Sequence, residues 1–320
     1  MEPLKLVAPC KDYLWGGTKL RTKYQQQSRE EKLAESWMLS CHKDGMSEIA
    51  QGAYAGMTLR DYIEREGRAV LGTDCGKFEE FPILVKLIDA QDRLSIQVHP
   101  DNAYALKNEG EYGKTEMWYI VENEPGASLY YGFQKPITKE EFRERIQRNT
   151  LLEVLNEVPV HPGDVFFIES GTLHAIGAGI VIAEIQQNSN TTYRIYDYGR
   201  VDKDGHGREL HIEKALDVTK LEKPQRPAKP QGETEICNGF SRTLLASCAY
   251  FTVFRMEISQ AAELTADETS FHSILCLSGE AELRYGNASL PICTGDSVFV
   301  PAGMGNYKIH GECGILLTKV

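Results

Sequence analysis

Three short fragments of the chain contain residue types that bind divalent metal ions: Gln97-Val98-His99-Pro100-Asp101, Lys114-Thr115-Glu116-Met117-Trp118 and Gly171-Thr172-Leu173-His174. Each lies in or beside a short apolar run typical of a β-strand, where alternate residues face the same side. Gln97 and His99 can therefore reach one ion together. With Glu116 and His174 they offer an amide oxygen, two imidazoles and a carboxylate. This set suits a zinc-like ion that keeps an open position for water or substrate.

Taken singly, each of these residues has an ordinary structural explanation. A histidine beside a proline is usually a residue of the surface or the core edge, Glu116 could pair with Lys114, and His174 could end a strand. Their joint placement, where strands of a barrel would face inward, favours the metal site.

The elements that must position these residues are mainly strands. Apolar runs predict them at 81–88, 94–98, 117–121, 128–131, 164–168 and 180–185. Helices are expected to begin at Thr58 and Thr138, and the second should continue through Phe142 and Ile146 into Leu151–Leu155. A shorter helix is expected at 100–108, starting with Pro100 and with Asp101 favouring its N-terminus, and another at 213–219.

Composition narrows the class of protein. The chain has 320 residues and a formal net charge of −11, which disfavours nucleic acid as a partner. It has neither a signal-peptide pattern nor an apolar run long enough to span a bilayer, so we expect a cytoplasmic protein without membrane association. The eight cysteines form no C-x-x-C pair and are expected to be reduced thiols. The sequence does not indicate an oligomeric state.

An internal repeat indicates two barrels. Residues 163–174 align without gaps to residues 295–306, and both copies have Gly-Asp at a turn, a buried strand and a second turn with Gly. This outline resembles the second cupin motif, with Glu169 in place of its proline and Asn306 where its histidine belongs. Two unrelated strand-turn units are the alternative.

We therefore predict a mainly β fold of two cupin-type jelly-roll barrels with a small helical insertion at about 134–157. Residues 1–220 would form the catalytic barrel, the proline-rich segment 221–232 a linker, and residues 233–320 a metal-free barrel.

Several stretches resemble type I mannose-6-phosphate isomerases, in particular their compact bacterial branch. The resemblance is carried by residues 81–86 and 94–101, Lys114–Trp118, 171–175, and 184–190 with Arg194, and also by Trp15-Gly-Gly17 and Glu35-Ser-Trp37. It covers nearly the whole chain, is most specific at Gln-x-His-Pro-Asp and is weakest after residue 230.

The resemblance implies a metal-dependent aldose-ketose isomerase that interconverts mannose 6-phosphate and fructose 6-phosphate. It implies one zinc ion per chain on Gln97, His99, Glu116 and His174. It also implies substrate contacts from Lys86, Ser95 and Trp15, and it places Lys114, Glu184 and Arg194 in the reaction pocket.

Such a reaction moves a proton between C1 and C2 through an enediol. Glu184 is the leading candidate for the base and Lys114 for the proton shuttle. Arg194, whose charge is fixed, is assigned to charge stabilisation. A structural ion pair between Glu184 and Arg194 stays open as an alternative.

Two other functions stay open. Two histidines and a carboxylate also suit a non-heme iron dioxygenase, although Gln97 would fill a position that oxygen or substrate needs. A non-enzymatic sugar-binding cupin would not need Lys114, Glu184 and Arg194 together.

Overall fold

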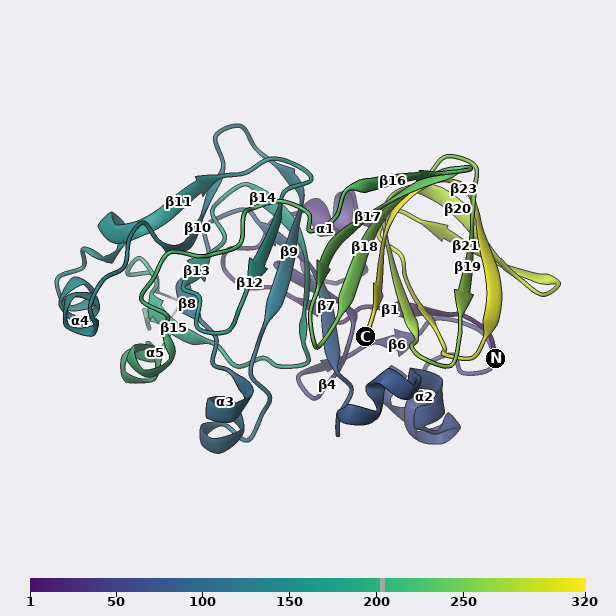
Figure 1. The fold of residues 1–320 in the computed structure, drawn as a ribbon, viewed down its shortest axis with the longest axis horizontal. Coiled ribbons are helices and arrows are strands. Elements are labelled where there is room, and N and C mark those ends of the chain that lie inside the picture. Colours follow the sequence, from purple (N-terminus) through teal and green to yellow (C-terminus); the bar gives the residue numbers. More distant parts are fainter. Residues whose placement is uncertain (202–204) are drawn as a thin grey trace. The chain divides into compact units, whose positions relative to one another are not determined.

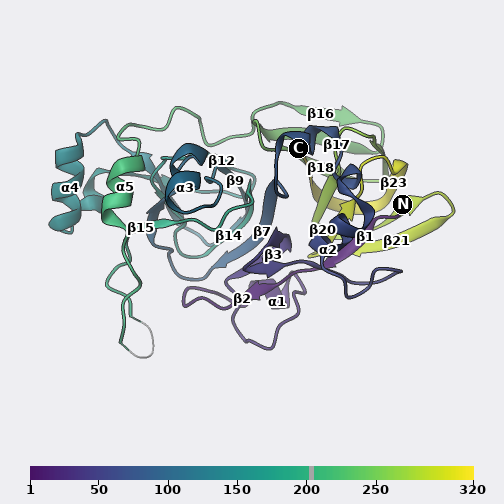
Figure 2. The same ribbon diagram turned by 90° about the horizontal axis from the view of Figure 1, so that it is seen from below.

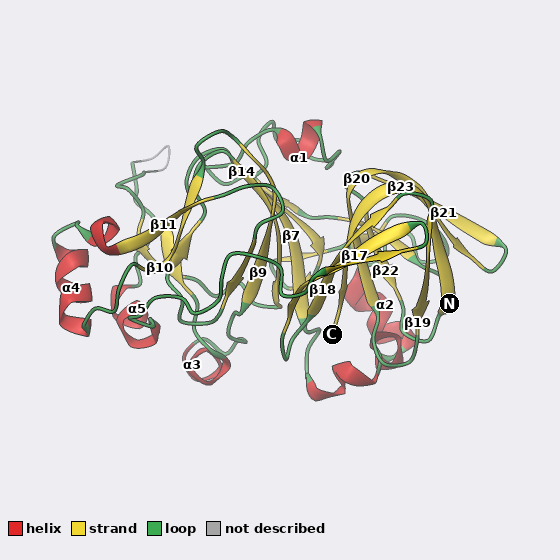
Figure 3. Ribbon diagram, turned by 45° about the horizontal axis from the view of Figure 1, so that its top comes forward, coloured by secondary structure: helices red, strands yellow, loops and turns green. Residues whose placement is uncertain are grey.

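The computed structural model describes residues 1–201 and 205–320, and strands dominate it (Figures 1 and 3). The chain divides into two compact units. Unit 1 comprises residues 1–12, 18–87 and 230–320, and unit 2 comprises residues 13–17 and 88–229. Strand β7 (Ile83–Ala90) passes from one unit into the other. In the described residues, no helix is both long and apolar enough to cross a membrane.

Unit 2 contains the three predicted metal-binding fragments. Its strands are β8 (Ile96–Val98), β9 (Glu116–Asn123), β10 (Ser128–Phe133), β11 (Leu155–Pro159), β12 (Val165–Ile168), β13 (His174–Ala175), β14 (Ile180–Gln187) and β15 (Tyr193–Tyr196). Its helices are α3 (Asn102–Asn108), α4 (Lys139–Gln147) and α5 (Ile212–Val218), with a 3-10 turn η3 (Leu151–Val154). All six predicted strands are confirmed, with ends that shift by a few residues.

The strands of unit 2 form two groups. One is the sheet β11-β10-β13-β8-β15, and the other is the antiparallel set β12-β9-β14. In β8, Ile96 and Val98 belong to an apolar cluster that also includes Phe142 of α4 and Leu216 of α5. Because side chains alternate along a strand, Gln97 faces away from that cluster, toward the other group of strands. The two helices lie side by side, joined by an ion pair between Arg143 and Glu213 (Figure 2).

Helix starts follow the predicted capping residues. The side chains of Thr58, Asp101 and Thr138 each accept a hydrogen bond from a backbone N–H in the first turn of their helix. The predicted length of the helix after Thr138 is wrong. Asn149 has a φ of 60°, which ends α4 at Gln147, and the chain continues as a 3-10 turn before Leu155 begins β11.

Unit 1 is built on one large sheet of order β16-β17-β18-β23-β20-β22-β1-β6, to which β19 and β21 also pair. Its strands are β1 (Leu4–Val7), β2 (Cys10–Lys11), β3 (Glu35–Leu39), β4 (Cys41–His42), β5 (Gly45–Met46), β6 (Glu48–Ile49), β16 (Thr234–Cys237), β17 (Phe240–Ser247), β18 (Thr252–Ile258), β19 (Ala261–Ala266), β20 (His272–Tyr285), β21 (Ala288–Cys293), β22 (Ser297–Val300) and β23 (Gly305–Lys319). Its helical elements are α1 (Lys19–Thr22), α2 (Leu59–Glu66), η1 (Arg68–Leu71) and η2 (Thr73–Lys77).

The compact units and the predicted domains differ in the N-terminal part of the chain. Residues 1–12 and 18–87 cluster with the C-terminal strands, and β1 pairs antiparallel with β22. The boundary between Lys229 and Pro230 falls within the predicted linker 221–232.

The two copies of the internal repeat share backbone geometry. Gly163 and Gly295 have φ values of 96° and 91°, and Gly171 and Gly303 have values of 86° and 74°. Only glycine adopts these values readily, so the matching positions keep the same turns in both copies. The copies differ at the position of the predicted ligand. His174 is fully buried, whereas Asn306 is exposed and accepts a hydrogen bond from the Thr265 hydroxyl.

Unit 1 contains a buried histidine that should make stability depend on pH. Nδ1 of His272 lies 2.8 Å from the Tyr307 hydroxyl. Burial, helped by the charge of Lys319 and opposed by that of Asp267, lowers the pKa of His272 from 6.5 to about 4. The folded protein favours the neutral form of this imidazole. The contribution of His272 to the free energy of unfolding is therefore complete above pH 6.5 and is lost as the pH falls toward 4.

In His272→Gln, the acid-induced loss of unfolding free energy between pH 6.5 and 4 should be smaller by up to about 3 kcal/mol. Urea titrations of both proteins across this pH range measure the difference. Parallel curves would contradict the prediction.

Candidate metal centre

The structure brings three predicted ligands into one buried group. The ligand atoms of His99, Glu116 and His174 all lie within 4.8 Å of one another, and each residue is at most 1% exposed. The Nε2 atoms of the two imidazoles are 3.1 Å apart, and the Glu116 carboxylate oxygens lie 3.4 Å from His174 Nε2 and 3.6 Å from His99 Nε2. Gln97 is the direct cross-strand partner of His174, and its amide nitrogen lies 3.4 Å from His174 Nε2.

Backbone carbonyls determine the tautomers of both histidines. His99 Nδ1 lies 3.0 Å from the Thr191 carbonyl oxygen, and His174 Nδ1 lies 2.8 Å from that of Thr172. A carbonyl can only accept, so both Nδ1 atoms must carry hydrogen. Burial lowers the pKa of both imidazoles, that of His99 to about 3, so both are neutral. Each Nε2 atom therefore presents a lone pair to the other and to Glu116.

This arrangement suits a metal cation. Both carboxylate oxygens of Glu116 are buried and neither has a well-formed hydrogen bond, although the Lys114 ammonium lies 3.0 Å from Oε2. Burial raises the pKa of this carboxyl, but the charge of Lys114 brings it well below its usual range, so the carboxylate is ionised. Two facing lone pairs beside a buried anion repel one another unless a positive ion lies between them. The donor set therefore fits a divalent metal ion.

Lys114 and Glu184 lie next to this group. Nζ of Lys114 is 3.0 Å from Glu116 Oε2 and 3.6 Å from Glu184 Oε1. Glu184 pairs across strands with Trp118, whose indole N–H donates a 2.8 Å hydrogen bond to Glu184 Oε2. The same indole packs edge-on against the His174 ring at 5.2 Å between centroids. Glu184 and Lys114 are 3% and 4% exposed, so their charges interact with little screening.

Ser95, directly before β8, lies beside Arg194 of the neighbouring strand β15. Arg194 is the cross-strand partner of Gln97, so its side chain shares the face of the sheet that carries the metal ligands. Its Nε donates to the Ser95 hydroxyl at 3.3 Å, and its Nη1 donates to the carbonyl of Glu209 at 2.9 Å. Burial, together with the nearby Arg208, lowers the pKa of Arg194.

Two predicted substrate-binding residues, Lys86 and Trp15, have neighbours other than the residues of the His-Glu-His group. Lys86 lies in the part of β7 that belongs to unit 1, where Nζ is 3.3 Å from a carboxylate oxygen of Glu35 and 5.2 Å from the ring centroid of Trp37. Trp15 is only 3% exposed, and its ring packs against Tyr13 at 5.7 Å between centroids.

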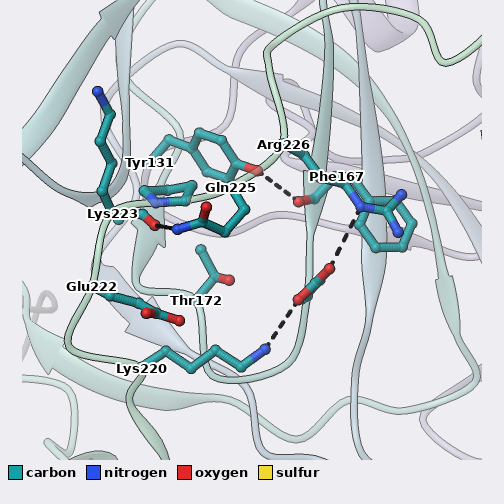
Figure 4. Close-up of a pocket in the computed structure, with 11 residues that line it drawn as sticks. Tyr131, Phe167, Thr172, Lys220, Glu222, Lys223, Gln225 and Arg226 are labelled. Atoms are coloured by element: carbon teal, nitrogen blue, oxygen red, sulfur yellow. Dashed lines mark hydrogen bonds and ion pairs between the residues drawn. The ribbon is translucent and has the colours of Figure 1, made fainter.

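A chain segment after α5 braces the turn that precedes His174. The N–H of Lys220 donates to the Gly171 carbonyl, and the Lys220 ammonium lies 3.1 Å from Glu169. Arg226 lies 3.5 Å from the same carboxylate, and its guanidinium stacks over Phe167 (Figure 4). A cavity of about 50 Å³ remains beneath this segment. The segment thus holds the turn whose Thr172 carbonyl orients His174.

Three groups of the site were not identified from the sequence: the carbonyls of Thr172 and Thr191 and the indole of Trp118. The carbonyls of Thr172 and Thr191 belong to turns, where side-chain type says nothing about carbonyl direction. Trp118 could have been found, because it lies two residues after Glu116 on the same strand and so shares its face.

A mainly β fold with a buried His-Glu-His group that could bind a metal ion is typical of cupin proteins. Residues 241–320 match the family model of the mannose-6-phosphate isomerase cupin domain, and residues 4–127 match that of the type I phosphomannose isomerase catalytic domain. The chain belongs to the type I mannose-6-phosphate isomerase family.

Similar proteins align over their full lengths. A mannose-6-phosphate isomerase of Streptococcus mutans is 38% identical over 99% of this chain and 98% of its own. One from Bacillus subtilis is 39% identical over 98% of both chains. The crystal structure of a Bacillus subtilis mannose 6-phosphate isomerase has a TM-score of 0.93 and 35% identity, with all of both chains covered.

Proposed function

We propose that this chain interconverts mannose 6-phosphate and fructose 6-phosphate with the help of one bound zinc ion. The observation that carries the metal dependence is the pair of neutral imidazoles, 3.1 Å apart at Nε2, beside the buried and ionised carboxylate of Glu116. His99, Glu116 and His174 would hold the ion. Gln97 would complete the set through its amide oxygen. Rotation of the amide group by half a turn exchanges the oxygen with the nitrogen that lies beside His174.

Each neighbouring side chain has a role in an enediol route. When bound, the zinc ion would supply Lewis-acid polarisation of the sugar's oxygens. Glu184 Oε1 would take the proton from C2 of the aldose and return it to C1. Lys114, which lies between the two carboxylates, would carry a proton between O1 and O2. Arg194 would stabilise the negative charge that develops on the enediolate.

The direct test is to incubate the purified protein with mannose 6-phosphate and measure fructose 6-phosphate, with glucose 6-phosphate and unphosphorylated mannose as comparison substrates. The proposal predicts rapid turnover of mannose 6-phosphate and no more than a slow residual turnover of mannose. Absence of turnover by zinc-loaded protein would overturn it. Oxygen consumption by an iron-loaded sample would instead favour a dioxygenase.

We also propose that Lys86 binds the substrate phosphate and that Ser95 and Trp15 contact the substrate. Lys86→Met should raise KM for mannose 6-phosphate by roughly 30-fold, which corresponds to about 2 kcal/mol for lost charge-assisted hydrogen bonds. The change in kcat should be much smaller, because the phosphate takes no part in the proton transfer.

Lys11→Met is the matched control for this prediction. Its ammonium also lies over the Trp37 ring, at 4.8 Å, but it is bonded to the Asp44 carbonyl. This variant should keep the KM of the wild type. If Lys86→Met lowered kcat/KM by the same factor for mannose and for mannose 6-phosphate, Lys86 would not be the residue that binds the phosphate.

A further inference from the structure

One carboxylate that the reaction does not use is connected to the metal ligand His99. The connection begins at the Thr191 carbonyl, which accepts a hydrogen bond from His99 Nδ1 at 3.0 Å. This bond holds the imidazole so that Nε2 points toward Glu116 and His174. The direction of one peptide carbonyl therefore determines whether His99 can act as a ligand.

Thr191 lies in a turn that strand pairing does not hold. Strand β14 ends at Gln187 and β15 begins at Tyr193, so residues 188–192 lie outside both strands. Inside this turn, the N–H of Thr191 donates to the Ser189 hydroxyl at 3.2 Å. A turn of this kind needs side-chain bonds from elsewhere to keep its carbonyls in one direction.

Glu111 provides these bonds through a single oxygen. Its Oε2 atom accepts from the Asn190 N–H at 3.0 Å, from the Thr191 hydroxyl at 3.0 Å and from the Ser189 hydroxyl at 3.3 Å. Hydrogen bonds to an ionised acceptor are stronger than neutral ones. Glu111 also lies five residues before the ligand Glu116, in the segment that leads from α3 into β9. It thus ties the turn behind His99 to the strand that carries a second ligand.

The other side of the turn is held independently. Nε2 of Gln186 donates to the carbonyls of Ser189 and Gln187, at 2.6 Å and 2.7 Å, and Gln187 bonds to Thr115 and Asn102. These amide contacts reach Ser189, whereas Glu111 bonds to the Asn190 N–H, the Thr191 hydroxyl and the Ser189 hydroxyl that accepts from the Thr191 N–H. Loss of Glu111 should therefore loosen that peptide without unfolding β14.

We propose that Glu111 is a positioning residue that sets the metal affinity of the site by fixing the Ser189–Thr191 turn against His99. The proposal rests on the metal site proposed above. Glu111 touches neither the ion nor the substrate. It acts through the Thr191 carbonyl, in the way that carboxylates bonded directly to metal-binding histidines orient those rings.

The test measures zinc affinity by competition with a chromophoric chelator, in protein first stripped of metal. Glu111→Ala should weaken zinc binding by about 10- to 100-fold, the range seen when groups that orient a ligand are removed. Glu111→Gln, which keeps an acceptor oxygen but loses the charge, should lie between Glu111→Ala and the wild type. In metal-free protein, the Asn190 N–H should exchange with solvent faster in Glu111→Ala.

Glu109→Gln is the matched control. Glu109 lies two residues earlier and accepts hydrogen bonds from the Tyr193 hydroxyl and from Lys214, both at 2.7 Å, outside the Ser189–Thr191 turn. It should keep wild-type zinc affinity. Equal affinities for Glu111→Ala and the wild type would overturn the proposal, as would an equal loss in Glu109→Gln. A wild-type protein that binds no zinc would instead overturn the metal site itself.

Discussion

Replacement of His174 by Ala is expected to remove the metal ion and the isomerase activity together. The variant loses one of two neutral imidazoles and leaves a single imidazole beside Glu116 in a fully buried site. Metal affinity should fall by more than the roughly 100-fold typical of groups that only orient a ligand. Because Lewis-acid stabilisation is worth several kcal/mol, turnover should fall by about 1,000-fold or more. His99→Ala should behave in the same way.

Metal content after gel filtration and the rate of fructose 6-phosphate formation measure the two effects. His272→Ala is a suitable control, because it removes a buried histidine of unit 1 that is bonded to Tyr307. That variant should keep one metal ion per chain. Exhaustive chelation of the wild type should reproduce the His174→Ala rate, and added zinc should restore only the wild type. Full turnover by metal-free wild-type protein would contradict the assignment of the site.

The second large effect is expected from Glu184→Gln. The amide keeps an oxygen that can accept from the Trp118 indole, so the side chain should stay in place. It cannot take a proton from carbon at neutral pH, so kcat should fall by about 100- to 10,000-fold, the usual contribution of a general base. Bound metal should stay at the wild-type level, which separates this variant from His174→Ala.

Incorporation of deuterium from heavy water into the sugar phosphate checks the role directly. Exchange and isomerisation should slow by the same factor if Glu184 is the base. The alternative left open from the sequence is a structural ion pair between Glu184 and Arg194, and the structure gives Glu184 an ion-pair partner in Lys114 at 3.6 Å. A Glu184→Gln variant that keeps more than a tenth of the wild-type kcat would support that alternative and remove Glu184 as the base.

Much of the candidate site was predictable because it depends on short-range periodicity. Gln97 of β8 and Glu116 and Trp118 of β9 lie in strands, with His99 directly after β8, and side chains two residues apart in an extended chain share a face. The strands themselves were recognisable from continuous apolar runs, and the helix starts at Thr58, Asp101 and Thr138 from their capping side chains. The mainly β cupin fold followed from these local signals and from the repeated Gly-Asp turn.

Contacts between distant residues depend on the tertiary structure alone. The carbonyls of Thr191 and Thr172 orient the two histidines, and their directions depend on Glu111 and on the segment around Lys220. The end of α4 depends on the left-handed backbone of Asn149, a conformation that an Asn-Thr pair permits but does not require. Residues 18–87 join the C-terminal strands because pairing between distant strands is decided by the packing of whole sheets. The sequence by itself thus determined which side chains could bind a metal ion, and the tertiary structure decided which backbone groups hold them in place.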